Sequence, residues 1–242
     1  MPTLKELKSI DLLPINLLPI DLLPIDLPQT RASYGTTPMT IRLHRGDLPD
    51  LSRYKGAVAI DTEAMGLDLA RDRMCVVQLS PGDGSADVVQ IPPHAADAPN
   101  LKRLLTDAGL LKIFHFARYD LGMLRKSFGV MPQPVYCTKI ASRLSRTYTD
   151  KHGLKDLVRE LLGVDISKQQ QSSDWGAAEL SEAQVSYAAS DVTHLHALKD
   201  KLDAMLAREG RKELAEACFR FLPDRVRLDL AGFAADDIFA HS

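Results

Sequence analysis

The order of short apolar segments after residue 56 constrains the fold of this chain more than any other feature of its sequence. Three runs rich in strand-forming residues follow one another closely, and turn residues such as Gly66 and Asp72 lie between them. The runs cover residues 57–60, 74–79 and 88–91. Because the connections are short, this succession predicts a meander of three strands.

Strand-like and helix-like segments alternate in the next part of the chain, which predicts an α/β domain. A helix at 101–105 precedes a strand at 112–116, and a helix at 119–128 precedes a strand at 135–138. The rest of the chain is predicted to be helical, at residues 139–146, 153–162, 181–209 and 211–222. Ser181 and Gln184 have the spacing of a capping box and mark the start of the longest of these helices.

Composition excludes several other classes of protein. The 242 residues are 45% hydrophobic and 26% charged, which is typical of one globular domain and not of a disordered chain. The net charge is 30 − 32 = −2, so no global positive field holds a long nucleic acid or an anionic membrane. Three scattered cysteines form no disulfide framework or metal motif. No apolar run is long enough to span a bilayer, and we expect a cytoplasmic protein.

The N-terminal region contains a five-residue repeat, DLLPI-NLLPI-DLLPI-DLP, at residues 11–28. Its regularly spaced prolines remove backbone donors and disfavour helix, so residues 1–38 are expected to be a low-complexity extension, extended or disordered. The repeat is either a docking peptide for a partner, a tail without function, or sequence upstream of the true start at Met39. The folded domain is therefore expected to be 39–242.

Two acidic residues end the first predicted strand. The sequence Ala-Val-Ala-Ile-Asp-Thr-Glu places Asp61 and Glu63 on the same face, because side chains alternate along a strand. Two carboxylates in one small space repel each other unless a proton or a cation lies between them, and a hard divalent metal is the simplest partner. The alternative is that both acids simply surround a solvated strand end.

Two further acids, Asp120 and Asp191, lie at helical positions where they could contribute to a functional site. Asp120 lies where the strand at 112–116 runs into the following helix, either in a site at the sheet edge or as a cap of that helix. Tyr187 and Asp191 are four residues apart and share one helix face with buried leucines. An acid on such a face needs an ion or a partner, although Asp191 could also pair with a surface cation.

Taken together, these motifs resemble the DEDD superfamily of 3′-to-5′ exonucleases, in its tyrosine subclass and RNase D-like branch. The resemblance is carried by the segments 61–63, 116–120, 174–175, 179–184 and 187–192, and it covers residues 40–230. Within that branch, the length of the domain and the start near Met39 are similar to the nano-RNase C family, whose members degrade very short oligoribonucleotides.

The resemblance implies an RNase H-like sheet of three antiparallel strands followed by parallel ones, flanked by helices. It also implies that Asp61, Glu63, Asp120 and Asp191 bind two divalent cations, Mg²⁺ or Mn²⁺, while Tyr187 orients the attacking water. All-oxygen ligands suit these ions, and two metals about 4 Å apart can activate water and stabilise the leaving 3′ oxygen. A homo-oligomer, an octamer by family resemblance, is implied as well.

The substrate contacts rest on weaker signals. Leu67 matches the family position of a leucine that wedges against terminal bases, but it could equally fill the core. His115 could stack on a base or contact a phosphate, or simply pack. The segment 139–159 carries a net charge of 6 − 2 = +4. The turn within this segment contains Tyr148, Lys151 and His152, which are expected either to cap the far base and 5′-phosphate of a dinucleotide or to be solvated.

The resulting prediction is a metal-dependent 3′-5′ exoribonuclease that degrades short RNA, dinucleotides included, to mononucleotides. Near-neutral charge favours short substrates, because long strands are held through many phosphate contacts. One alternative is a broader RNase D-like exonuclease that trims RNA or DNA 3′ ends. Another is a catalytically silent nucleic-acid-binding module, and a third is a scaffold that acts through its proline repeat.

Overall fold

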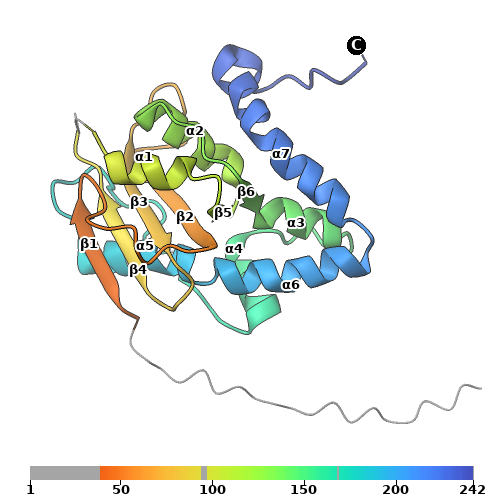
Figure 1. Cartoon of the computed structure of the whole chain (residues 1–242), viewed down its shortest axis with the longest axis horizontal. Coiled ribbons are helices and arrows are strands. Elements are labelled where there is room, and N and C mark those ends of the chain that lie inside the picture. Colours follow the sequence, from red (N-terminus) through yellow and green to blue (C-terminus); the bar gives the residue numbers. More distant parts are fainter. Residues whose placement is uncertain (1–38, 94–96, 168, 242) are drawn as a thin grey trace, which may run out of the picture. The chain divides into compact units, whose positions relative to one another are not determined.

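The computed structural model describes residues 39–93, 97–167 and 169–241. Its centre is one six-stranded sheet in the order β1-β4-β3-β2-β5-β6, with helices on both faces (Figure 1). The strands are β1 (Ile41–Arg45), β2 (Ala57–Ala64), β3 (Met74–Ser80), β4 (Ala86–Gln90), β5 (Leu111–Phe114) and β6 (Val135–Cys137). The expected proline-rich extension, residues 1–38, lies outside the described residues.

The pairing pattern confirms the predicted fold class. β2, β3 and β4 form an antiparallel meander, and β5 and β6 continue the sheet in parallel with β2. β3 is buried along its whole length, because helices cover the sheet on both sides. In Figure 1, α1 (Pro99–Thr106) and α2 (Ala117–Phe128) lie on one face, and α5 (Glu182–Thr193) and α6 (Leu195–Arg208) lie on the other.

The helices after β6 form most of the second half of the described chain. They are α3 (Thr138–Ser145), α4 (Leu154–Leu157), the π-helical η1 (Val158–Leu162), α5, α6, α7 (Lys212–Leu228) and η2 (Asp229–Phe233). The Ser181–Gln184 capping box is present, with both reciprocal hydrogen bonds, at the start of α5. Within the described residues, no helix combines the length and the apolar content that crossing a bilayer requires.

Three helix predictions need correction. The predicted helix at 181–209 is two helices that meet at His194, and the predicted helix at 153–162 changes from α to π geometry at Val158. The helix predicted to end at residue 222, before a proline, continues to Leu228 with Pro223 inside it. Pro223 is buried, so tertiary packing outweighs the local cost of the missing donor.

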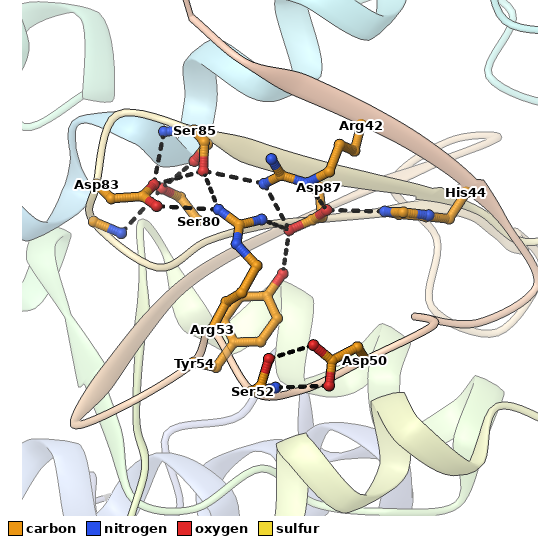
Figure 2. A network of polar contacts seen from close by, with 11 residues as sticks. Arg42, His44, Asp50, Ser52, Arg53, Tyr54, Ser80, Asp83, Ser85 and Asp87 are labelled. Carbon is orange, nitrogen blue, oxygen red and sulfur yellow. Dashed lines mark hydrogen bonds and ion pairs between the residues drawn. The ribbon is translucent and has the colours of Figure 1, made fainter.

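The edge strand β1 was missed by the sequence analysis, and a buried carboxylate on β4 explains its stability (Figure 2). Asp87 accepts hydrogen bonds from Arg42 Nε at 2.7 Å, Arg53 Nη1 at 3.0 Å and Tyr54 Oη at 2.7 Å. His44 Nε2 lies 2.8 Å from the same carboxylate. Two arginines and a phenol thus satisfy one buried charge and connect β1, β4 and the segment before β2.

Candidate active site

The end of β2 supplies the first two acids of the site. β5 pairs only with Ala57–Ala59 of β2, so the strand continues past its parallel neighbour and leaves Asp61 and Glu63 beside open space. On the other side β3 stays paired up to Ala64, where the register shifts. Asp61 and Glu63 therefore lie on a part of β2 that is paired with β3 on one side and borders a cavity.

Helix α5 brings the third acid to the same place. α5 packs across β2, β3 and β4, and it directs Asp191 toward the end of β2. One carboxylate oxygen from each of Asp61, Glu63 and Asp191 lies within 4.8 Å of the other two. Tyr187, one turn earlier on α5, lines the same cavity, and its ring centroid is 6.0 Å from that of the buried Trp175.

Asp120 approaches from a third element, the first turn of α2. Its Oδ1 accepts a hydrogen bond of 2.7 Å from Thr62 Oγ1, and its side chain is buried in the lining of the cavity. Asp120 is not among the three residues whose carboxylate oxygens cluster within 4.8 Å. Its charge nevertheless reaches Asp61 and Glu63, where it helps raise both pKa values.

The four carboxylates have raised pKa values, chiefly because of burial. Burial and the charges of the other three acids raise the pKa of Asp61 well above its ordinary value. Burial and the charges of Asp191 and Asp120 raise the pKa of Glu63 to about 9. Burial raises the pKa of Asp120 to about 7, although the bond from Thr62 opposes this. The pKa of Asp191 is also raised to about 7 by burial, against a lowering hydrogen bond from Tyr187.

Gln78 is a site residue that the sequence analysis missed. It lies on β3 directly opposite Asp61, and its Nε2 donates a hydrogen bond of 2.8 Å to Asp61 Oδ2. Gln78 is fully buried, and its Oε1 has no hydrogen-bond partner among the described residues. The available signal was a lone amide in the apolar run Met-Cys-Val-Val-Gln-Leu-Ser, where a buried polar group requires a partner.

The cavity beside these acids has a volume of about 650 Å³. Two of the predicted substrate contacts, Leu67 and His115, line it. Leu67 is 85% exposed, so it is not a core residue. His115 Nδ1 lies 2.9 Å from Thr138 Oγ1, and burial together with the charge of Lys139 lowers the pKa of His115 to about 3. His115 is therefore neutral at physiological pH.

The loop that carries Leu67 is tied to the helix that carries Asp120. Tyr119 donates a hydrogen bond of 2.6 Å from its hydroxyl to the carbonyl oxygen of Gly66. Gly66 itself is pressed against Asp72, since a Cβ added there would lie 2.3 Å from Asp72 Oδ2. The position of Leu67 at the cavity is thus set by Tyr119 and by the close approach at Gly66.

The other three predicted substrate contacts lie outside the residues that line this cavity. Tyr148 is 66% exposed, and its hydroxyl is 3.4 Å from Arg146 Nε. Lys151 is exposed, and His152 Nδ1 lies 2.8 Å from Ser142 Oγ. The structure therefore groups the five predicted catalytic residues with Leu67 and His115, and it separates them from the turn at 148–152.

The donor set fits a divalent cation. All candidate ligands are carboxylate oxygens, which suit Mg²⁺ or Mn²⁺ better than zinc. The charges of the neighbouring acids contribute, after burial, to the raised pKa values of Asp61 and Glu63, so these carboxylates repel one another in the absence of a cation. A cation bound by these oxygens would remove that repulsion, and Asp120 is close enough to contribute charge to the same site.

Comparisons with known proteins agree with this arrangement. A family model described as 3′-5′ exonuclease matches residues 48–207. Brucella melitensis NrnC bound to pGG is 62% identical, with a TM-score of 0.82 over 84% of this chain and 100% of the NrnC chain. The same protein with bound Mg²⁺ is 61% identical, with a TM-score of 0.81 and the same coverage of both chains.

Ribonuclease D of Granulibacter bethesdensis is 38% identical over 154 residues, which are 64% of this chain and 38% of that relative. The chain thus spans less than half the length of the curated ribonuclease D relatives it matches.

Proposed function

The chain belongs to the 3′-5′ exonuclease family, in its RNase D-like branch, and we propose that it releases mononucleotides from the 3′ ends of short oligoribonucleotides, dinucleotides included. The observation that carries the proposal is the convergence of Asp61, Glu63 and Asp191 in the lining of one cavity. The pGG in the NrnC complex, a 5′-phosphorylated dinucleotide, supports a substrate of this length.

The volume of the cavity and the net charge of the protein support short substrates over long ones. A cavity of about 650 Å³ is in the range of small-ligand sites. A long strand is held by many phosphate contacts, and the net charge of −2 supplies no general attraction for it. The short substrate therefore has to be held by the residues that line the cavity.

We assign the five predicted residues their roles as follows. Asp61, Glu63, Asp120 and Asp191 hold two divalent cations, Mg²⁺ or Mn²⁺. When bound, these cations would supply a water nucleophile at neutral pH and a stabilising charge for the leaving 3′ oxygen. Tyr187, whose pKa is raised by burial and by the nearby carboxylates, keeps its proton and orients the attacking water. The water oxygen would form a bond to phosphorus while the bond between phosphorus and the 3′ oxygen breaks. The 3′ oxygen would leave as a hydroxyl with a proton derived from the water, and the terminal nucleotide as a nucleoside 5′-monophosphate.

Product analysis on 5′-labelled pGG, with Mg²⁺, with Mn²⁺ and with a chelator, tests this function. We expect metal-dependent release of mononucleotides. Asp61→Ala, Glu63→Gln, Asp120→Asn and Asp191→Asn should each lower turnover by orders of magnitude without unfolding the protein. Asp237→Asn, an exposed acid outside the cavity, is the control. Near-normal turnover at one of the four positions would remove that residue from the site.

A length series separates this function from the alternatives. A sharp preference for RNA below about five nucleotides favours the proposal, since a small site cannot follow a longer backbone. Equal turnover of long RNA or of DNA 3′ ends would favour a broader RNase D-like exonuclease, which the similarity to ribonuclease D supports. Binding without metal-dependent release would favour a silent nucleic-acid-binding module.

The proposal also includes the oligomeric state of the protein and its location in the cell. By family resemblance, we expect the protein to form a homo-oligomer, an octamer. From the scattered cysteines, we expect it to act in the cytoplasm. Sedimentation equilibrium of the purified full chain measures the first of these expectations directly.

A further inference from the structure

Two residues that line the cavity occupy positions that their local structure disfavours. Phe116 is the N-cap residue of α2 and has a φ of +67°, in the left-handed region. Among the described residues it is the one non-glycine residue with a positive φ. The left-handed backbone conformation is unfavourable for a phenylalanine, and its side chain has no oxygen that could accept hydrogen bonds from the free N–H groups at the start of the helix.

The second residue is Lys139, in the first turn of α3. A cation at the start of a helix faces the positive end of the helix dipole, which is unfavourable. Lys139 appears in no ion pair within the described part of the chain, although four carboxylates line the same cavity. Its Nζ lies instead 4.1 Å from the centroid of the Phe116 ring.

Neither residue is explained by packing in the core. The Phe116 side chain is 46% exposed, and the cation covers one part of the ring surface. Strained backbone and disfavoured side chains that persist together at a cavity are typical of functional positions. The aromatic ring and the cation line the same cavity as the four acids.

We propose that Phe116 and Lys139 form a nucleotide subsite, in which the ring of Phe116 stacks on a base of the substrate and Lys139 pairs with a phosphate of the same strand. Stacking on an aromatic side chain tolerates every base, since each presents a planar face. Among the described residues that line the cavity, the cations are Lys139 and Lys155, so Lys139 offsets the charge of the acids where the phosphates approach. The inference rests on the proposed function and adds the residues that hold the substrate.

The substitution Phe116→Gly separates a binding role from a structural one. Glycine adopts a positive φ without strain, so the melting temperature should stay equal or rise. The lost stack should raise KM for pGG about tenfold or more, with a smaller change in kcat. Phe116→Leu, which keeps an apolar side chain without an aromatic face, should also raise KM. Phe221→Leu is the matched control, because Phe221 is 39% exposed on α7 and outside this cavity.

A substrate without the stacked base gives the sharpest readout. Two dinucleotides, each lacking one of the two bases, are tested. The one that lacks the stacked base should bind the unsubstituted protein weakly, and Phe116→Gly should not weaken it further, whereas the other should still be weakened by Phe116→Gly. An equal loss for the intact and abasic substrates would overturn the stacking role, as would an unchanged KM for pGG. Lys139→Gln should raise KM and reduce its dependence on salt concentration. An unchanged salt dependence would overturn the phosphate contact.

Equilibrium dialysis with labelled pGG in Ca²⁺ keeps the two proposals distinguishable. If the unsubstituted protein binds pGG but releases no mononucleotide in Mg²⁺ or Mn²⁺, the proposed function fails. Tight binding that Phe116→Gly weakens would then still support the subsite. If the protein turns over pGG and Phe116→Gly binds it equally well, the subsite fails while the proposed function stands.

Discussion

Single residues decide how the negative charge of this site is tolerated. Asp61 has carboxylate neighbours on β2, α2 and α5, and the side-chain amide of the buried Gln78 donates a hydrogen bond to it. A hydrogen bond from Gln78 fixes Oδ2 and leaves Oδ1 free of this contact. Residues that orient a metal ligand in this way commonly alter metal affinity when they are replaced.

The first prediction concerns Gln78. Gln78→Leu removes the donor to Asp61, and we expect Mg²⁺ affinity to fall by about 10- to 100-fold. Isothermal titration calorimetry with Mg²⁺ measures it. Gln90→Leu is the control, since Gln90 lies on the adjacent strand and donates to the carbonyl oxygens of Ala177 and Ala178. An unchanged affinity in Gln78→Leu would show that Asp61 needs no such support.

The second prediction concerns Gly66, where the chain approaches Asp72 closely. Asp72 cannot move freely, because it also accepts hydrogen bonds from Arg71 and from the backbone N–H of Asp68. Gly66→Ala should therefore displace the loop that carries Leu67 and raise KM for pGG, with a loss of about 1–3 kcal/mol in the free energy of unfolding. Steady-state kinetics and urea unfolding measure the two effects. Gly84→Ala is the comparison. An added Cβ at Gly84 would meet no atom within 4 Å, but the positive φ of +82° strains any other residue there, so this substitution should lower stability without changing KM.

At the scale of elements, the sheet edge depends on a charge network rather than on apolar burial. β1 is only five residues long, and its side chains are half-buried or exposed, so burial of its own side chains contributes little to the stability of the sheet edge. Asp87, on β4, joins it to the segment that contains Arg53 and Tyr54 (Figure 2). The network thus stabilises an edge that could otherwise separate from the sheet.

The third prediction tests that network. Asp87→Asn leaves two arginines without their buried partner, and we expect a loss of about 3 kcal/mol in the free energy of unfolding. Asp83→Asn is the matched control. The Asp83 side chain also pairs with Arg53 but is 56% exposed, so its loss should cost less than about 1 kcal/mol. Urea denaturation of both variants measures the difference, and equal losses would contradict the central role of Asp87.

At the scale of the whole molecule, the site should couple stability to pH. In the folded, metal-free protein, burial raises the pKa of Asp120 and of Asp191 from 3.8 to about 7, and that of Glu63 from 4.5 to about 9. Between pH 7 and 8 the folded state therefore holds more protons than the unfolded state. By linkage, the free energy of unfolding falls as pH rises, by about 1.4 kcal/mol per pH unit for each extra proton.

The fourth prediction is that the metal-free protein melts at a lower temperature at pH 8 than at pH 7. Saturating Mg²⁺ should reduce this difference, and Glu63→Gln should reduce it without metal. Two groups oppose the effect only weakly in this window. His115, whose pKa is lowered to about 3, is already neutral in the folded protein, and Lys112, whose pKa burial lowers to about 8, loses its proton mainly toward and above pH 8. Equal melting temperatures in a chelator at pH 7 and pH 8 would contradict it.

The sequence predicted the parts of this molecule that depend on local pattern. The meander, the later alternation and the capping box at Ser181 follow from periodicity and spacing, and all appear in the structure. β1 could not be found in this way, because its alternation is weak and Asp87, which holds it, lies far along the chain. The convergence of the acids was expected from a resemblance, whereas the contacts of Gln78 and Phe116 depend on neighbours that only the folded chain brings together.

The acids of the site come from β2, α2 and α5, and α5 follows β2 only after most of the sheet has been made. A polypeptide still emerging from a ribosome therefore has no complete cluster until its α5 segment has been synthesised and has packed across the strands. If these acids carry the hydrolysis, a partly translated copy that lacks α5 has no complete site. The order of the segments along the chain thus makes activity a property of a polypeptide that has been synthesised at least through α5.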